Sequence, residues 1–477
     1  VRASGLVRQI TNEWMYFDGM QDSERAKVSD YSIEASLESI AAIAKHQLGD
    51  TASTAYLRLV RAEIAKHLGA ENHQKRIADI GRKSFAEPLK CAMGLEATLD
   101  PTLCTTEPRS HIRSVLLKAP SYTLAPGSAP VNYGISAAID SKGPYDRDTF
   151  RQANPHILVI TPKSRRGQVE QFLKRFRDGG LPPVFAKGFV AKYHLRGSQW
   201  TFIDFLDDRN DPAMAYQSAC IRAIQDSRDK IRPYHLALVV VSERDRDLGQ
   251  HDPYLVAKST LMGAGVPVQV VEIETIQLDE KQWPYVLNNL ALAAYAKIGG
   301  TPWTLSAPKG QGITHEIVVG IGSATIREKR QSSSERYVGI ATLFNYDGVY
   351  LVSQVAKEAS FDDYPRAIEQ ALRSCLSQIG ERKGWRSGDQ VRLIFHVFKP
   401  LKNTEIRAVS KFIERELSNY VVQYAFLTIS SDHDWMLFDP LSTGFTTRQG
   451  ITRGNQVPAR GSAVFLKPRE LLLSMTG

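Results

Sequence analysis

Four side chains between residues 254 and 297 have the types that can hold a phosphate and the flat ring attached to it. Tyr254 and Lys258 are four residues apart, so they share one face if the segment is helical. The lysine offers positive charge to an anion, and the tyrosine ring offers a surface on which a base can stack. Gln269 and Lys297 add an amide and a second ammonium group. Spacing alone leaves ordinary packing as the more frequent explanation, because Tyr–Lys pairs at helix starts are common.

The elements around these residues can be predicted from local signals. Asp252 followed by Pro253 is a favoured helix start, which places Tyr254 and Lys258 in the first turns. Free N–H groups and the helix dipole attract anions there. Gln269 lies in the predicted strand 266–272. Lys297 closes the predicted helix 285–300, on the same face as Asn289.

The surrounding segment alternates between strands and helices. Apolar runs at 156–162 and 235–242 are typical of buried parallel strands, and helical patterns follow at 167–180 and 213–227. This alternation predicts an α/β fold with a doubly wound, Rossmann-like sheet. Ligands of such sheets bind outside the carboxyl ends of the strands.

The order of elements changes after Pro302. Three strands come first, and the last two are joined by the hairpin signal "NYDG". A helix, a strand, a helix and a strand follow, up to residue 430. The order β-β-β-α-β-α-β is that of an RNase H-like domain.

The chain therefore divides into four predicted parts. Residues 1–100 form a helical N-terminal extension of unknown role, with Ser32 and Thr51 as candidate N-caps. Residues 101–152 form a linker rich in Pro, Gly, Ser and Thr. Residues 153–300 form the Rossmann-like domain, and residues 301–477 the RNase H-like domain. The chain starts with Val and stops in the apolar run "FLKPRELLLSMTG", so we expect a fragment, with the RNase H-like domain incomplete at its C-terminus.

Composition narrows the class of protein. The formal net charge is +9 with a pI of about 9.2, which modestly favours a polyanionic partner. Without a run of about 18 apolar residues or a signal-peptide pattern, we expect no transmembrane helix and no membrane partner. The four cysteines are far apart and predict neither a zinc site nor a disulfide framework, so a cytoplasmic location is expected.

The ordered set Tyr254, Lys258, Gln269 and Lys297, followed by "KIGGTPW", resembles the MID domain of prokaryotic Argonautes. The stretches "GPYD", "PHILVITP" and "FAKGF" agree with this resemblance, and the RNase H-like part resembles the PIWI domain. The resemblance covers roughly residues 113–477. It implies that the four residues hold the 5′-phosphate of a guide strand, with the Tyr254 ring stacked on its first base. It also implies that Mg²⁺ can assist there, bridging Gln269 and a C-terminal carboxylate.

The resemblance also bears on catalysis. An RNase H-type site needs several carboxylates to hold two divalent metals. In active Argonautes the first is an Asp in a "VGID"-like strand, where this chain has Gly322. At the second position Val397 or Phe398 stands, and Glu358 is either a remnant of a third ligand or an ordinary loop acid. We therefore expect no cleavage by this chain.

Loss of these carboxylates resembles the short prokaryotic Argonautes, which carry MID and PIWI domains only. That resemblance implies a guide RNA that pairs with single-stranded target DNA. It also implies a separate APAZ-containing effector, which is sirtuin-like, TIR or a nuclease, and a role in antiviral defence by abortive infection. The alternative is a guide-directed, metal-dependent nuclease that uses displaced carboxylates such as Glu358, Asp432 and Asp434. A fragment of a long Argonaute is a third reading.

Two basic loops are candidate contacts for a nucleic-acid backbone, although such loops are more often solvated surface. Their basic residues are Lys163, Arg165, Arg166, Arg327, Lys329 and Arg330. The stretch "GIGSA" at 320–324 superficially resembles a dinucleotide-binding loop. It lacks the third glycine and a following helix, so NAD binding is not expected.

Overall fold

The computed structural model describes most of the chain after residue 111. The described ranges there are 112–206, 212–242, 252–306, 310–326, 335–354, 358–359, 364–398, 403–446 and 452–475. Before them it describes shorter stretches, among which 69–90 is the longest. The chain forms two compact units: Val1–Lys118 together with Asp434–Gly477, and Ala119–His433. Each unit is considered by itself.

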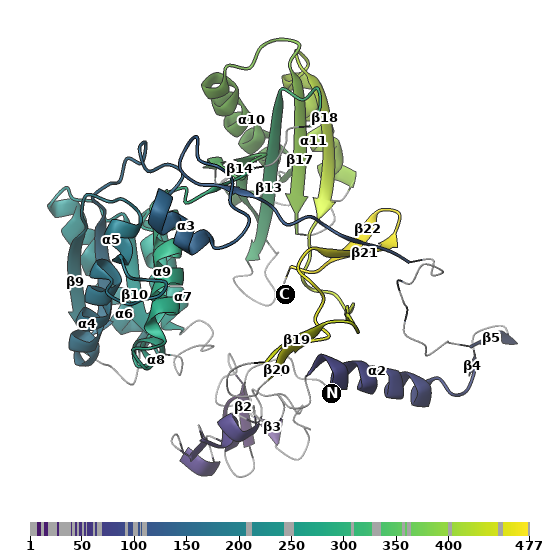
Figure 1. Cartoon of the computed structure of the whole chain (residues 1–477), viewed down its shortest axis with the longest axis horizontal. Coiled ribbons are helices and arrows are strands. Elements are labelled where there is room, and N and C mark those ends of the chain that lie inside the picture. Colours follow the sequence, from purple (N-terminus) through teal and green to yellow (C-terminus); the bar gives the residue numbers. More distant parts are fainter. Residues whose placement is uncertain are drawn as a thin grey trace. The chain divides into compact units, whose positions relative to one another are not determined.

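The second unit contains a four-stranded parallel sheet in the order β11-β10-β8-β9 (Figure 1). Its strands are β8 (His156–Pro162), β9 (Gln199–Phe205), β10 (Leu236–Val241) and β11 (Val268–Glu272). The central strands β8 and β10 are almost wholly buried, which explains their continuous apolar runs. Three of the four strands are confirmed as predicted, and β9 was not foreseen.

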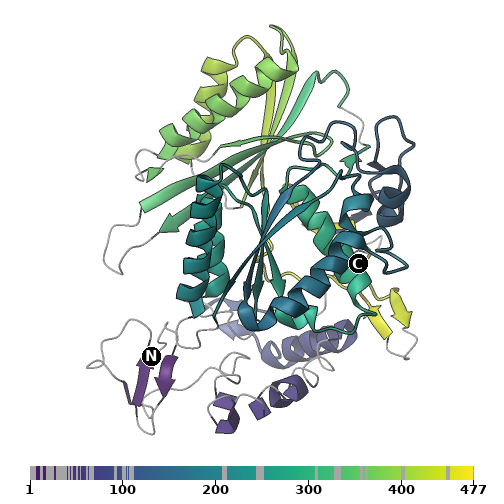
Figure 2. The ribbon, with the colours of Figure 1, turned by 90° about the vertical axis from the view of Figure 1, so that its left-hand side faces the viewer.

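Helices cover both faces of this sheet, as Figure 2 shows. The core on one face combines the sheet with α4 (Arg166–Asp178), α5 (Gly188–Lys192) and α9 (Trp283–Lys297). The core on the other face combines it with α6 (Pro212–Asp229) and α7 (Pro253–Gly263). Side chains alternate between the two cores along each strand, because successive residues of a strand point to opposite faces.

Short elements complete this part of the unit. They are β7 (Tyr122–Thr123), α3 (Ile135–Lys142), the 3₁₀ turn η3 (Lys163–Arg165), α8 (Ile273–Ile276) and β12 (Thr304–Leu305). β7 pairs with β12 in antiparallel fashion. Part of the predicted linker 101–152 is thus built into the fold.

The second sheet of the same unit has the strand order β15-β14-β13-β17-β18, with β16 paired to β14. Its strands are β13 (His315–Ile326), β14 (Glu335–Asn345), β15 (Tyr350–Gln354), β16 (Glu358–Ala359), β17 (Gln390–Val397) and β18 (Val421–Thr428). The helices α10 (Tyr364–Lys383) and α11 (Asn403–Glu416) interleave with the last strands. The predicted order β-β-β-α-β-α-β is confirmed, and the small strand β16 is an addition to it.

One face of this sheet forms the core with α10 and α11. Every second residue of β13 and β17, such as Ile317, Val319, Leu393 and Phe395, is buried in that core. The residues between them, including Gly320 and His396, are only half-buried. The sheet therefore has one helix-covered face and one more open face within the described residues.

The first unit departs from the helical N-terminal extension that the sequence predicted. It contains α2 (Ala70–Ser84), and the residues described between 40 and 63 are helical. It also contains a three-stranded antiparallel sheet of β1 (Val7–Ile10), β2 (Trp14–Phe17) and β3 (Ala26–Lys27). Prediction missed this sheet because each strand is very short. The proposed caps Ser32 and Thr51 lie outside the described residues.

The rest of the first unit is built from strand pairs. β6 (Arg113–Leu116) pairs with β21 (Ser462–Lys467), which pairs with β22 (Glu470–Leu473). Two further pairs are β4 (Leu89–Lys90) with β5 (Glu96–Ala97), and β19 (Thr443–Thr446) with β20 (Thr452–Asn455). The pairing of β6 with β21 joins segments almost 350 residues apart, which no local sequence signal reveals. No helix among the described residues is long and apolar enough to cross a membrane.

Candidate functional site

A cavity of about 540 Å³ lies along β11, the edge strand of the parallel sheet. α7 and α9, which pack on opposite faces of the sheet, both contribute to its walls. The lining residues are Tyr254, Lys258, Val268, Gln269, Val270, Val271, Glu272, Thr275, Val286, Asn289, Leu290, Ala293 and Lys297. The four residues singled out in the sequence are therefore brought together in one cavity.

The start of α7 is built as the sequence predicts. Asp252 is its N-cap, and one carboxylate oxygen accepts hydrogen bonds from the backbone N–H groups of Tyr254 at 2.7 Å and Leu255 at 3.4 Å. Pro253 occupies the first helical position, where no backbone donor is needed. The Lys258 ammonium donates to the Tyr254 hydroxyl at 3.0 Å and lies 5.2 Å from the centre of its ring. The cap thus fixes the helix that presents both side chains to the cavity.

The opposite wall depends on the free edge of β11. The carbonyl of Pro267 accepts a hydrogen bond from Ala237 at the start of β10. Because backbone groups alternate in direction along a strand, the carbonyls of Val268 and Val270 point away from β10, toward the open edge. An unpaired strand edge is a liability that folded proteins cover or block.

Two side chains of the set satisfy this edge. The Lys297 ammonium donates to the Val268 carbonyl at 2.6 Å and to the Gln269 side-chain oxygen at 2.7 Å. The Gln269 amide nitrogen donates to the Val270 carbonyl at 2.9 Å. Lys297 and Gln269 are thus held in place by the strand that forms the floor of the cavity.

The cavity concentrates positive charge. Burial lowers the pKa of Lys297, and the nearby Lys258 ammonium lowers it further, although the side chain stays partly open to solvent. Among the described residues neither lysine forms an ion pair with a carboxylate. A bound anion would relieve the repulsion between the two ammonium groups, and a cation would increase it.

The same electrostatics argue against a metal site made by these residues alone. The oxygen of Gln269, the atom that would ligate Mg²⁺, already accepts a hydrogen bond from Lys297. In the described part of the chain no group of three or more His, Cys, Asp or Glu side chains could hold a metal ion. The residues present do not fit a resident magnesium ion.

Comparisons with known proteins agree with the two sheets. The family model "Piwi domain" matches residues 239–467. Over 476 residues the chain is 31% identical to the protein argonaute of Cereibacter sphaeroides, an alignment that covers 96% of this chain and 59% of that protein. It is also 23% identical over 195 residues to the Piwi protein of Archaeoglobus fulgidus, covering 39% of this chain and 43% of that protein. This chain contains a Piwi domain and is a homologue of a bacterial Argonaute.

The chain spans 59% of the length of the first of these relatives and 43% of the second. Among solved structures, the Argonaute of Clostridium butyricum, bound to a guide DNA and a 19-mer target DNA, superposes with a TM-score of 0.50 at 15% identity. That match covers 74% of this chain and 43% of the other. The fold is accordingly an Argonaute-like α/β fold that includes a Piwi domain.

The RNase H-like sheet of the Piwi domain carries the two positions at which the sequence comparison with active Argonautes expects catalytic carboxylates. Gly322 lies near the end of β13, and a Cβ added there would meet no atom within 4 Å. Val397, at the end of β17, is only 4% exposed and packs into the helix-covered core. Phe398, the next residue, is 43% exposed and points to the open face. Of the two candidates for the second catalytic position, Phe398 therefore has the orientation that a metal ligand would need.

The structure describes the side chains of two of the three displaced carboxylates of the nuclease alternative. Asp432 and Asp434 are both exposed, and they fall in different units of the chain. Glu358 belongs to β16, but its side chain lies outside the described residues. The described residues therefore contain no carboxylate cluster that could bind a metal ion.

The first basic loop of the sequence follows the carboxyl end of β8. Lys163 and Arg165 are exposed there, in the turn η3. Arg166 is engaged within the protein: it contacts Glu170 at 2.9 Å and Asp204 at 3.4 Å, and lies over the Phe202 ring. The basic residues of the second loop, Arg327, Lys329 and Arg330, lie outside the described residues.

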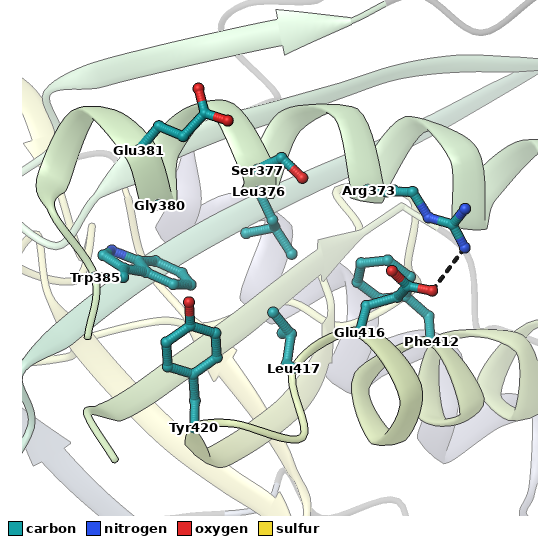
Figure 3. Close-up of a pocket in the computed structure, with 10 residues that line it drawn as sticks. All are labelled: Arg373, Leu376, Ser377, Gly380, Glu381, Trp385, Phe412, Glu416, Leu417 and Tyr420. Atoms are coloured by element: carbon teal, nitrogen blue, oxygen red, sulfur yellow. Dashed lines mark hydrogen bonds and ion pairs between the residues drawn. The ribbon is translucent and has the colours of Figure 1, made fainter. Parts of the chain in front are cut away.

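A second cavity, of about 320 Å³, was not foreseen from the sequence. It lies between α10 and α11 of the Piwi domain, with the rings of Trp385 and Tyr420 at one end (Figure 3). The Arg373 guanidinium is paired with Glu416 at 2.7 Å, and Glu381 also contributes to the lining. Because its only cation is neutralised, this cavity does not suit a phosphate, which leaves the β11 cavity as the candidate anion site.

The lowered pKa of Lys297 predicts pH-dependent binding of a phosphate. Only the protonated ammonium attracts the anion, so as pH rises from neutral toward about 10.4, where an ordinary lysine loses its charge, affinity for a 5′-nucleoside monophosphate should fall earlier than it would with an ordinary lysine. Isothermal titration calorimetry across this range measures the change. Lys297→Arg, which keeps its charge, should flatten the profile, and a flat wild-type profile would contradict the prediction.

Proposed function

We propose that this chain is a guide-strand-binding protein of the Argonaute type whose β11 cavity holds the 5′-phosphate of the guide. The observation that carries the proposal is the convergence of Tyr254, Lys258, Gln269 and Lys297 on one cavity. Two ammonium groups suit a doubly charged phosphate. The Tyr254 ring at the same cavity offers a surface for the first base.

The partners of this site follow from the resemblance and from the comparisons. The Clostridium butyricum relative is described as bound to a guide DNA and a target DNA. For this chain we propose a guide RNA that pairs with single-stranded target DNA in the cytoplasm. The net charge of +9 and the exposed Lys163 and Arg165 support contacts to a nucleic-acid backbone.

We also propose that the Piwi domain does not cleave. Gly322 and Phe398 occupy the positions where an active site would place carboxylates, and neither can ligate a metal. Recognition of an invading nucleic acid must then be passed to another protein.

The proposed recipient is an APAZ-containing effector that is sirtuin-like, TIR or a nuclease, as in short Argonautes that act in antiviral defence by abortive infection. Target DNA should switch on the effector only when the guide-loaded chain is present. To measure this dependence, the chain, the effector, the guide and the target are reconstituted together. NAD loss or DNA degradation is then assayed. Effector activity that is independent of the guide would refute the partnership.

A longer Argonaute is the second candidate, and one observation favours it. The alignment with the Cereibacter sphaeroides protein covers 96% of this chain, so it extends through most of the N-terminal region that a MID–PIWI protein would not need. In that case the same β11 cavity would bind the guide, within a protein that has additional domains. Active cleavage by such a protein would still require carboxylates that the described Piwi domain lacks.

The phosphate proposal predicts a measurable preference for phosphorylated guides. The wild type should bind a 5′-phosphorylated RNA more tightly than its 5′-hydroxyl twin. Lys258→Ala with Lys297→Ala should reduce this preference at least about tenfold, because each lysine makes a charged hydrogen bond. Filter binding with radiolabelled RNA at fixed salt gives both dissociation constants.

The matched control removes two charges elsewhere in the same unit. Lys174→Ala with Lys230→Ala changes an exposed lysine of α4 and the exposed lysine directly after α6, neither of which lines the cavity. This control variant should weaken the binding of both RNAs equally and keep the preference for the 5′-phosphorylated RNA. Equal binding of the two RNAs by the wild type would mean that the fold is present without the guide pocket.

The proposed loss of catalysis predicts that the chain does not cleave a target strand. The purified chain, loaded with guide and given complementary DNA with Mg²⁺ or Mn²⁺, should yield no product, because two metals need several carboxylates. A denaturing gel of labelled target is the measurement. Metal-dependent product that disappears in Asp432→Ala with Asp434→Ala would establish the nuclease alternative.

A further inference from the structure

One half-buried carboxylate ties the end of α9 to the segment that precedes the parallel sheet. Asp146 accepts a hydrogen bond from the Tyr295 hydroxyl at 2.5 Å on one oxygen, and from the Thr301 backbone N–H at 2.8 Å on the other. Tyr295 lies two residues before Lys297, and Thr301 lies four residues after it. A single side chain therefore holds both sides of the helix end that carries Lys297.

The turn between these contacts is tightly constrained. Gly299 has a φ of +91°, and the Gly300 N–H donates to the Tyr295 carbonyl at 2.9 Å, as in a glycine-terminated helix. A Cβ at residue 300 would lie 2.4 Å from the Tyr295 ring, so the backbone passes directly over that ring. The chain then continues to Thr301, where the Asp146 carboxylate receives it.

The backbone and neighbouring rings reinforce this contact. Tyr145 N–H donates to the Pro302 carbonyl at 3.0 Å. The Tyr295 ring is fully buried, stacked on Tyr193 at 4.4 Å and packed against Phe150 at 4.9 Å. Burial raises the pKa of Asp146, whereas its two hydrogen bonds lower it and so favour the carboxylate. The donors thus compensate a charge that burial would otherwise disfavour.

The segment before the parallel sheet also contacts α9 two turns earlier. The Ser136 hydroxyl donates to the Asn288 side-chain oxygen at 2.8 Å, and the buried Lys192 ammonium donates to Ser136 at its carbonyl and hydroxyl oxygens. Asn288 and Tyr295 are seven residues apart, on one side of the helix. The cavity is lined by a different set of α9 residues, which includes Asn289, Ala293 and Lys297.

We propose that Asp146 is a positioning residue of the β11 cavity, which acts by fixing the last turn of α9 and hence the place of Lys297. Lys297 is the final residue of α9, and helix ends fray unless they are capped. Its ammonium reaches the Val268 carbonyl and the Gln269 oxygen at 2.6 and 2.7 Å, contacts that a small shift of the helix end would break. The inference rests on the proposed binding of a 5′-phosphate at this cavity.

The experiment measures the ratio of dissociation constants for 5′-hydroxyl and 5′-phosphorylated RNA in a set of variants. Asp146→Ala should lower the ratio about tenfold, and Tyr295→Phe, which keeps the ring and loses one hydrogen bond, should lower it by a smaller factor. Asp146→Asn should retain most of the ratio. Its amide oxygen can accept from Thr301 while its nitrogen donates to the Tyr295 hydroxyl.

The matched control is Tyr216→Phe. It removes another buried tyrosine hydroxyl, which α6 carries on the opposite face of the sheet from α9 and which donates to the Val240 carbonyl. It should leave the ratio unchanged. Binding of the 5′-hydroxyl RNA should change little in all variants, because that ligand does not use Lys297.

A double-mutant cycle separates positioning from general stability. When Asp146→Ala is added to Lys258→Ala, the ratio of the two dissociation constants should fall further. When it is added to Lys297→Ala, the ratio should not change. Equal further losses in both backgrounds, or a fall in Tm with an unchanged ratio, would overturn the inference. A wild-type ratio near one would be a different failure, since it would remove the proposed function before any variant is made.

Discussion

The open edge of β11 is the constraint on which the candidate site depends. A parallel strand at the edge of a sheet leaves every second carbonyl and N–H without a partner strand. Here the carbonyls of Val268 and Val270 receive hydrogen bonds from the side chains of Lys297 and Gln269 instead. Side chains that cap an edge need less room than a further strand or helix, so α7 and α9 can stand apart and leave a cavity between them. The capping groups are polar and cationic, which gives the cavity its chemistry.

The arrangement has an electrostatic cost that a ligand can offset. Two ammonium groups share one cavity, and the pKa of Lys297 is lowered by burial and by Lys258. Among the described residues both lysines have hydrogen bonds but no carboxylate in an ion pair, which is a condition under which an anion binds well. Groups held in place before binding also lose little freedom when the ligand arrives. Lys297 is held by β11 and by the Asp146 contact at the helix end, so much of its ordering is complete in the free protein.

The sequence could predict the parts of this site that depend on local rules. Asp252 and Pro253 mark the start of a helix, the four-residue spacing places Tyr254 and Lys258 together, and the apolar run identifies the strand that carries Gln269. The order of strands and helices after Pro302 could also be predicted from the sequence. Asp146 was not identified, because its two partners lie about 150 residues away and nothing near it in the sequence signals them. The strands β1 to β3 and the pairing of β6 with β21 were missed for similar reasons: the former are very short, and the latter is non-local.

Alternation of side chains in the RNase H-like sheet separates the residues that make its core from those at the proposed catalytic positions. Side chains alternate along β13 and β17, so the residues that face the helices, such as Val319 and Val397, make the core. Gly322 and Phe398 face the other way, where a metal site would be, and contribute little to that core. Substitution on the open face is therefore nearly free of packing constraints, whereas substitution one residue away is not. This separation supports the proposal that the sheet keeps its fold without catalytic carboxylates. Under that proposal, the β11 cavity supplies the chemistry of ligand binding. Contacts from three different segments of the chain fix its lysines.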